Sequence, residues 1–414
     1  MKSDMTHIKL KDILAFIVDN RGKTPPLSDG GYRLLEVNAV SALKKSPVYA
    51  DVRKYVDFQT YNTWFRKGHP QIGDILIPTV GTLGAVSFVN SNDCCIAQNL
   101  IAIRPDQSVC DSHYLYYYLS NPLTRKRLLN LDIGGVQPSI KVPHIMDLDI
   151  DLPPLSKQRK CAVILKALDD KIELNQEINE NLQQQMQVIF QEWFIDNPSS
   201  AEWPRGTFSD LIERTASGDW GKEAPCGNHT EAVYCIRGAD IPDVRAGNKG
   251  KMPTRYILPK NYAAKRLADG DIVVEISGGS PTQSTGRAAA ISTALLNRYD
   301  KGMVCTNFCK ALKPIRGYSM YVFHYWQHLY DAGVFFLYEN GTTGIKNLDI
   351  SSFLETEPIV IAPVALVEQF DALCRPIFAN IYADGLENEK LSSVRDTLLP
   401  RLLSGEIDVS DIQI

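Results

Sequence analysis

The chain has 414 residues, of which 44% are hydrophobic, and its formal net charge is −4. This composition is typical of globular proteins, and the length predicts two or three domains. No apolar run reaches the 18 or so residues that a membrane span needs, and the N-terminus lacks the apolar core of a signal peptide, so we expect a cytoplasmic protein without a membrane partner. Nine scattered cysteines without zinc-ligand spacing predict reduced thiols and no metal site.

The first 152 residues predict a globule of mixed α and β structure. "GDILIPTVGTLGAVSFV", which starts at Gly73, contains short apolar runs separated by Gly and Pro, as in a set of β-strands. "SHYLYYYLSNPLTRKRLL", which starts at Ser112, has apolar residues at helical spacing. The net charge is too negative for a bulk nucleic-acid binder, but it allows a locally basic binding face.

Residues 153–199 predict one long helix that begins at Pro153-Pro154 and ends at Asn197-Pro198. A 4-3 alternation along it predicts a heptad seam with two asparagines at its middle, which would set the register of a partner helix. The side chain of Phe194 and other apolar residues off this line widen the stripe, so we expect the helix to contact more than one partner element. The seam consists of Cys161, Leu165, Leu168, Ile172, Asn175, Asn179, Leu182, Met186, Ile189 and Trp193.

Residues 200–361 predict a second mixed globule, and residues 362–414 predict a second long helix. Gly405 is the expected stop of this helix, while Pro376, Gly385 and Pro400 predict kinks or breaks within it. Because the two helical stretches match in length, we expect them to pair antiparallel; the alternative is that each packs only on its own globule. The second seam consists of Leu366, Phe370, Leu373, Ile377, Leu391, Val394 and Leu398.

The two globules share a series of short matches in the same order. "LKDIL" at Leu10 matches "FSDLI" at Phe208, an offset of 198, and "GDILI" at Gly73 matches "GDIVV" at Gly270, an offset of 197. Further matches follow at slowly rising offsets, as loop insertions would produce. The order of these matches predicts a duplication of about half the chain. The expected fold class is therefore α+β, with two duplicated mixed α/β domains separated by two long antiparallel coiled-coil helices.

Several segments resemble the specificity subunits of type I restriction–modification systems, the HsdS family. "LPPLSKQRKCAVILKALDDKIELNQEINENLQQQMQVIFQEWF" is similar to the central conserved region of that family, and "LSSVRDTLLPRLLSGEI" to its C-terminal conserved region. "GDILIPTVGTLG" and "YENGTTGIKNLDI" resemble segments of its target-recognition domains. The resemblance implies target-recognition domains at 1–152 and 200–361, with spacer helices at 153–199 and 362–414.

The resemblance also implies a noncatalytic, sequence-specific DNA-binding protein. Each target-recognition domain would read one half of a bipartite double-stranded DNA target, and the helices would set the spacing between the two halves. Methyltransferase subunits, two copies, would dock on the helices, and two restriction or motor subunits would complete the complex. S-adenosylmethionine and ATP are then expected only in the partner subunits, and this chain is expected to bind no cofactor.

The best candidates for DNA contact are the polar, glycine-containing loops of both globules. Glycine permits close backbone approach, Ser, Thr and Lys can hold phosphates, and Gln and Arg can read base edges. An ordinary turn is the alternative for any single residue. The candidates are Arg21, Lys23, Thr79, Gly81, Thr82, Gly84, Gln137, Ser139, Lys141, Lys222, Ser277, Gly278, Gly279, Gln283, Thr285, Arg287, Thr342, Thr343 and Lys346. Asn99 and Asn307, at an offset of 208, also occupy similar places after the Gly-Asp strands.

Three other functions stay open from the sequence. A methyltransferase with its own recognition domain would need an AdoMet loop and a catalytic Asn-Pro-Pro-Tyr-type motif, and neither is present in the sequence. A coiled-coil scaffold without direct DNA reading agrees with the negative charge. A specificity factor of a modification-only methyltransferase would keep the DNA role without restriction.

Overall fold

The computed structural model describes residues 5–40, 44–132, 134, 138–280, 283–341 and 345–413. The chain forms two compact units. Unit 1 comprises Met1–Lys171 and Leu391–Ile414, and unit 2 comprises Ile172–Lys390. Each unit therefore contains one globule together with a segment of each long helix.

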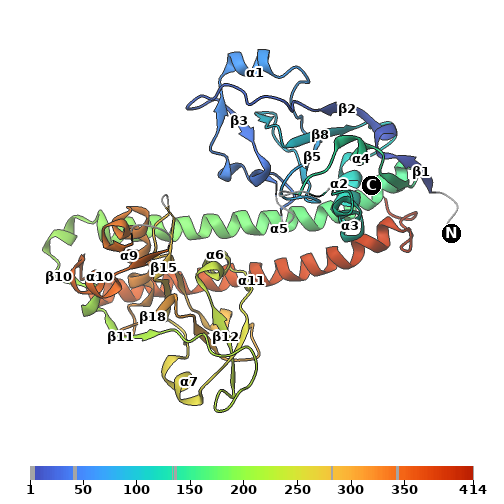
Figure 1. Ribbon diagram of the computed structural model, residues 1–414. Helices are drawn as coiled ribbons and strands as arrows, with labels where there is room; N and C mark the ends of the chain where they lie inside the picture. The colour runs from blue at the N-terminus through green and yellow to red at the C-terminus, as the bar shows by residue number, and fades with distance from the viewer. Residues whose placement is uncertain are drawn as a thin grey trace. The chain divides into compact units, whose positions relative to one another are not determined.

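Unit 1 is built around a four-stranded antiparallel sheet with strand order β2-β8-β5-β6. Figure 1 shows β2, β8 and β5 side by side. A three-stranded sheet, β4-β3-β7, and a two-stranded pair, β1-β9, complete the strands described in this unit. The strand bounds are β1 Thr6–Lys9, β2 Leu14–Val18, β3 Tyr32–Leu35, β4 Tyr55–Val56, β5 Ile75–Pro78, β6 Ser87–Phe88, β7 Cys94–Ile96, β8 Leu100–Pro105 and β9 Asp149–Leu152.

Four short helices accompany these strands: α1 Phe58–Trp64, α2 Ser112–Ser120, α3 Pro122–Leu129 and α4 Val142–Met146. The helical pattern predicted from Ser112 onward is thus two helices. Asn121 follows α2, and its side chain accepts a hydrogen bond from the Leu123 N–H at 2.8 Å, which caps α3. Pro122 stands in the first turn of α3, where its missing N–H costs nothing.

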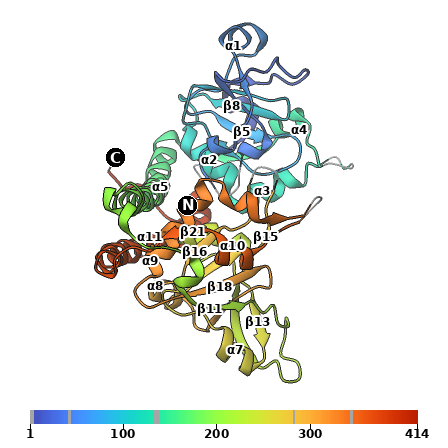
Figure 2. The same ribbon diagram turned by 90° about the vertical axis from the view of Figure 1, so that its left-hand side faces the viewer.

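Unit 2 repeats these sheets, with strand orders β11-β18-β14-β16, β13-β12-β17 and β10-β21. Figure 2 shows β11 and β18 of the larger sheet next to each other. A further sheet, β15-β20-β19, is present in this unit. The strand bounds are β10 Arg205–Thr207, β11 Ile212–Ser217, β12 Glu231–Ile236, β13 Thr254–Ile257, β14 Ile272–Glu275, β15 Ser277–Gly278, β16 Ala288–Ala290, β17 Met303–Cys305, β18 Cys309–Pro314, β19 Glu339–Asn340, β20 Lys346–Leu348 and β21 Pro358–Val360. The helices of this globule are α6 Ile241–Arg245, α7 Pro259–Lys265, α8 Thr293–Leu296, α9 Ser319–Asp331 and α10 Ile350–Thr356.

The duplication predicted from the sequence is confirmed by these matching strand orders, and the irregularities repeat as well. The β2–β8 register shifts between Leu14 and Phe16, and the β11–β18 register shifts between Ile212 and Arg214. A buried ion pair also repeats in both globules. The aspartate of each Gly-Asp motif, Asp74 in one and Asp271 in the other, pairs with a cation on the neighbouring strand, Arg104 and Lys313 respectively. The Gly-Asp motifs therefore hold strands together inside each globule.

The two predicted long helices are α5, Leu155–Phe190, and α11, Val364–Leu403. A five-residue π-helical turn, Gln191–Ile195, extends α5. The prediction of breaks in α11 is wrong, because one helix of 40 residues runs through Pro376, Gly385 and Pro400. A kink at these residues stays a prediction. The predicted stop is confirmed, since α11 ends two residues before Gly405, which has a φ of 71°. Among the described residues, no helix is both long and apolar enough to cross a membrane.

A glycine inside α11 permits a close backbone approach. A Cβ atom at Gly385 would lie 1.9 Å from the carbonyl oxygen of Gly247, which follows α6. A Cβ atom at Gly247 would in turn lie 2.2 Å from the Ile381 carbonyl oxygen. Glycine at position 385 lowers the helix propensity of α11, but it allows a main-chain contact that any side chain would prevent.

The antiparallel pairing of α5 and α11 is confirmed by polar contacts in both units. In unit 1, Arg395 Nη1 donates to Asp169 Oδ1 at 2.8 Å. In unit 2, Asn175 Nδ2 donates to Asn388 Oδ1 at 2.9 Å, and Asn179 Nδ2 donates to the Ile381 carbonyl at 3.0 Å. Both asparagines of the predicted seam are buried and bonded across the helix pair, as expected for residues that set register.

The predicted phase of the second seam is wrong at two positions. Leu373 is 36% exposed and Val394 is 47% exposed, so neither lies in the helix interface. The buried line of α11 is formed by Val367, Phe370, Cys374, Ile381, Gly385, Asn388, Leu399 and Leu402. A pattern search for leucine and valine misses it because Cys, Gly and Asn occupy central seam positions.

Both helices also supply the hydrophobic cores of the globules. In unit 1, Leu165 of α5 and Leu402 of α11 belong to the same core cluster as Tyr114 and Tyr117 of α2. In unit 2, Phe190 and the nearby Phe194 join Phe370 of α11 and residues of α9 in one core. Each long helix therefore pairs with the other helix and also packs on the globules, so both expected arrangements are present. Phe194 is fully buried, so it belongs to the core of unit 2 rather than to a free partner-docking face.

Candidate nucleic-acid interface

In unit 1, the two predicted polar loops of the first globule lie together. Gly81 donates its N–H to the Pro138 carbonyl at 3.0 Å, and Ile140 donates to the Thr79 carbonyl at 2.9 Å. These bonds place the turn at 79–84 against the segment that leads into α4. Residues more than 50 positions apart in the sequence thus form one surface.

Not every candidate on this surface is available to a ligand. Thr79 is buried, and its hydroxyl donates to the Asn99 carbonyl at 3.2 Å. A Cβ atom on Gly84 would lie 2.9 Å from Arg125 Cγ, so this glycine allows α3 to pack closely. Both are structural residues, which corrects their prediction as DNA contacts. Thr82 and Lys141 are exposed, Gly81 and Ser139 are half-buried, and Gln137 lies outside the described residues.

The predicted loops of the second globule also meet, through the small sheet β15-β20-β19. Gly278 is paired with Lys346, and Ser277 is paired with Asn347. The Ser277 hydroxyl donates to Asn347 Oδ1 at 2.7 Å. The corresponding contact in unit 1 is a single β-bridge between Val80 and Ser139.

Glu339 ties two further candidates into the fold. It accepts from the N–H and hydroxyl of Thr285 at 2.6 and 3.0 Å, and its other oxygen pairs with Lys346 Nζ at 2.7 Å. Burial opposes ionisation of Glu339, but the hydrogen bonds from Lys346 and Thr285 hold its pKa below the usual value. Thr285 is fully buried and therefore cannot touch DNA, which corrects the prediction for this residue.

Arg287 does not present a free guanidinium fork to DNA, contrary to expectation. Its Nε and Nη2 donate to the two carboxylate oxygens of Glu275 at 2.7 and 2.6 Å. This bidentate hydrogen bonding raises the pKa of Arg287. Glu275 itself is only 5% exposed. Gln283 and Gly279 remain exposed, whereas Thr342 and Thr343 lie outside the described residues.

The candidate cations near the start of each globule are at the surface. The guanidinium of Arg21 makes a bidentate pair with Asp19 at 2.7 and 2.8 Å. Because exposed pairs of this kind contribute little, a phosphate could compete for this arginine. Lys23 and Lys222 are exposed. The role of all these residues in binding DNA stays a prediction.

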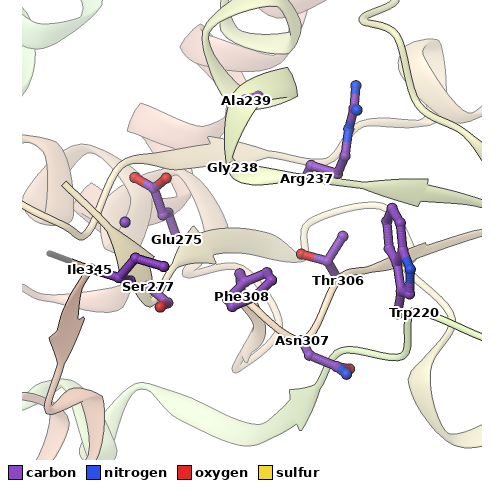
Figure 3. A pocket seen from close by; sticks show the side chains of 11 residues that line it. Trp220, Arg237, Gly238, Ala239, Glu275, Ser277, Thr306, Asn307, Phe308 and Ile345 are labelled. Atoms are coloured by element: carbon purple, nitrogen blue, oxygen red, sulfur yellow. The ribbon is translucent and has the colours of Figure 1, made fainter.

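A pocket of about 450 Å³ opens next to the glycine loop of unit 2. Figure 3 shows its side chains, with Phe308 between Glu275 and Thr306. The exposed ring of Phe308 (59%) and the exposed side chain of Ile345 (64%) supply apolar surface. The lining residues are Trp220, Arg237, Gly238, Ala239, Glu275, Ser277, Gly278, Thr306, Asn307, Phe308 and Ile345.

Unit 1 has a pocket of about 350 Å³ at the equivalent place. Its residues 36–38 and 97–99 correspond to residues 237–239 and 306–308 of the unit 2 pocket. This correspondence follows from matching backbone hydrogen bonds: Ala97 N–H to the Leu35 carbonyl at 2.8 Å, and Thr306 N–H to the Ile236 carbonyl at 2.9 Å. The lining residues are Thr24, Pro25, Leu34, Glu36, Val37, Asn38, Lys54, Ala97, Gln98 and Asn99.

The same bonds shift the predicted equivalence of Asn99 and Asn307 by one residue. Thr79 donates to the Asn99 carbonyl, and Ile276 donates to the Phe308 carbonyl, both at 2.9 Å. Asn99 therefore corresponds to Phe308, and Asn307 corresponds to the residue before Asn99. The offset of 208 taken from the sequence pairs Asn99 with Asn307. The backbone hydrogen bonds give the correct pairing, because they fix which residues of the two loops occupy the same place.

The two equivalent pockets differ in chemistry. In unit 1, Glu36 and Lys54 form an ion pair at 2.7 Å, and amide side chains surround them. In unit 2, Arg237 occupies the position of Glu36, and Glu275 occupies the position of Pro78. Arg237 binds Asp240 through Nε and Nη2 at 2.8 and 3.0 Å. One backbone framework thus carries two different sets of hydrogen-bonding groups.

The sequence reasoning missed Glu275, Phe308 and the unit 1 residues Glu36 and Gln98. An available signal was the position of Glu275 at the end of the Gly-Asp strand, directly before the polar loop. The local sequence around Phe308 does not predict that its ring is exposed. Within the described part of the chain, no cluster of His, Cys, Asp and Glu could hold a metal ion.

Two repeated globules on a shared pair of helices, each with a pocket at the same place, define a duplicated protein with two equivalent pockets of different chemistry. Residues 2–184 match the family model described as the type I restriction modification DNA specificity domain. Over these residues the chain is similar to the specificity subunits of type I restriction–modification systems.

Two specificity subunits are similar to this chain over most of its length. The chain is 25% identical over 367 residues to the type I restriction enzyme MjaIX specificity subunit of Methanocaldococcus jannaschii, covering 82% of this chain and 79% of that protein. It is 24% identical over 402 residues to the HindI specificity subunit of Haemophilus influenzae, covering 81% and 86% respectively. The crystal structure of a type I restriction–modification S subunit from M. genitalium shares the fold, with a TM-score of 0.51 and 14% identity over 96% of both chains.

Proposed function

We propose that this chain recognises a bipartite double-stranded DNA sequence, with each globule reading one half. The observation that carries the proposal is the pair of equivalent pockets with different linings, Glu36 and Lys54 in one and Glu275 and Phe308 in the other. A repeated backbone presents the same face to each half of the target, while different side chains select different bases. The exposed candidates Thr82, Lys141 and Gln283 lie on the polar loops of the two globules.

The helix pair would dock methyltransferase subunits and set the distance between the half-sites. Four exposed apolar residues of α5, Val163, Leu174, Ile178 and Val188, support docking. At about 100° per residue they fall within an arc of about 80° on one helix face. An exposed apolar stripe of this kind fits a partner helix. The repeat of the fold suits two copies of one methyltransferase partner, followed by two restriction or motor subunits.

The chain's own part in this proposal is noncatalytic. Binding of S-adenosylmethionine and ATP, together with methylation and cleavage, would belong to the partner subunits. This chain would bind no cofactor, and the complex would act in the cytoplasm, as expected from the sequence.

Binding of the assembled methyltransferase complex to a randomised DNA library tests the proposal. We expect enrichment of one sequence with two short specified halves and an unspecified spacer of fixed length. Methylome sequencing of a host that expresses the system, with and without this chain, should give the same sequence. Binding without any sequence preference would contradict DNA reading and favour the scaffold alternative.

A further inference from the structure

The floor of the unit 2 pocket carries a carboxylate whose surroundings are kept clear by two glycines. A Cβ atom on Gly238 would lie 2.4 Å from Glu275 Oε1, and one on Gly278 would lie 2.8 Å from the same oxygen. Gly238 follows β12 and Gly278 belongs to β15, so two separate segments leave space at one atom. Side chains at either position would cover this oxygen.

The charges around the pocket disfavour a phosphate as the ligand. The guanidinium of Arg237 is held by Asp240 and by the Lys251 carbonyl at 2.8 Å, and Arg287 is held by Glu275. Each cation is thus matched by a carboxylate. An ionised carboxylate accepts hydrogen bonds and donates none, so Glu275 would repel a phosphate and favour a neutral donor.

The walls of the pocket supply apolar surface beside the carboxylate. Phe308 and Ile345 expose apolar side chains, and Arg255 Cζ lies 3.8 Å above the ring centre of Trp220, which fixes that indole. Apolar side chains such as that of Phe308 can contact the edge of a base pair in the major groove beside a hydrogen-bonding group. The identity would then come from the hydrogen-bonding group at the floor. Among the groups that bases present in the major groove, the N4 amino group of cytosine and the N6 amino group of adenine are the donors.

We propose that Glu275 Oε1 accepts a hydrogen bond from the exocyclic amino group of one cytosine or adenine in the half-site read by unit 2. This inference rests on the proposed function, since it assigns one contact within that recognition. Arg287 acts as a positioning residue, because its bidentate bonds hold the carboxylate in place from behind. The unit 1 pocket has Pro78 at the matching position and therefore cannot make this contact.

The test removes the amino group from the DNA and weakens or covers the acceptor on the protein. The assembled complex with methyltransferase subunits is titrated with target duplexes in which each cytosine or adenine of the unit 2 half-site is replaced, one at a time, by 2-pyrimidinone or purine. We expect one position at which deletion of the amino group weakens binding by about 10-fold to 100-fold, as for a hydrogen bond to a charged group. The base at that position decides between cytosine and adenine.

Two protein variants, each measured with the same set of modified duplexes, complete the test. Glu275→Gln removes the charge of the acceptor, and Gly238→Ala covers Oε1 while leaving the charge in place. In both, the amino-deletion penalty at that position should fall below about threefold, while penalties at other positions stay unchanged. Gln98→Ala in the unit 1 pocket is the matched control, which should leave the whole unit 2 profile as it is.

The outcomes separate this inference from the proposed function. If the complex binds a bipartite sequence but no unit 2 position depends on an amino group, or if both variants retain that dependence, the assignment of Glu275 is overturned. A wild-type complex that binds DNA without sequence preference would instead overturn the proposed function itself.

Discussion

Replacing Gly385 by Ala separates two opposite effects on stability. Glycine inside a helix costs about 1 kcal/mol relative to alanine, so propensity alone predicts that G385A stabilises α11. The structure predicts the reverse. The new Cβ would lie 1.9 Å from the Gly247 carbonyl oxygen and 2.5 Å from its carbonyl carbon, and neither backbone atom can rotate away.

The size of the net effect follows from these two terms. Overpacking typically costs about 1 to 3 kcal/mol, and a backbone contact this short belongs at the upper end. Subtracting the gain of about 1 from a cost of about 3 leaves a net loss of about 2 kcal/mol in the free energy of unfolding. The loss should be confined to unit 2, which contains both glycines.

Urea unfolding followed by tryptophan fluorescence measures this loss. Four of the five tryptophans, Trp193, Trp203, Trp220 and Trp326, belong to unit 2, so the signal reports mainly on that unit. Asn380→Ala, at an exposed position of the same helix, is the matched control and should stabilise by about 0.5 kcal/mol. A midpoint for G385A at or above that of the wild type would refute the close-contact argument.

Three further predictions address the helices, a buried histidine and the exposed loop. Seven residues inserted into each helix, after Ile172 and after Lys390, should add about 10.5 Å, or about three base pairs, to the spacer of the methylated sequence; an unchanged spacer would refute the helices as a ruler. Burial lowers the pKa of His324 to about 3, below the ~6.5 of an unfolded histidine, so its contribution is full above about pH 6.5 and is lost as pH falls toward 3. The wild type should therefore lose urea resistance over this range more steeply than His324→Gln, and parallel profiles would contradict this. Gln283→Ala should broaden recognition in one half of the methylated sequence only, and equal broadening of both halves would count against modular reading.

The long helices could be predicted because their signals are local. Apolar spacing, the prolines before α5 and the glycine after α11 all act within a few residues of the element they define. The positions of the seam asparagines in α5 could also be predicted, because they interrupt an otherwise apolar line of residues. The buried face of α11 could not be predicted, because Cys374, Gly385 and Asn388 place small or polar groups in the helix interface. Their fit depends on what the opposite surface offers, such as the Gly247 backbone.

The candidate site was predictable only as a region. The structure brings the predicted polar glycine loops together in each unit. Exposure decided which members remain candidates, and burial removed Thr79 and Thr285. Arg287 was predicted to contact DNA because of its guanidinium group. Its Nε and Nη2 donors already bind Glu275, so the prediction was wrong for a reason other than burial.

By itself, the sequence determined that this protein is a duplicated pair of mixed globules linked by two long helices, because repeats and periodicity are written along the chain. Only the tertiary structure decided how the pockets of the two duplicated globules differ in chemistry. The unit 2 pocket joins Gly238, Glu275 and Phe308, three residues from separate strands or loops. Long-range hydrogen bonds place these residues together, and such bonds depend on the register between strands rather than on any local pattern.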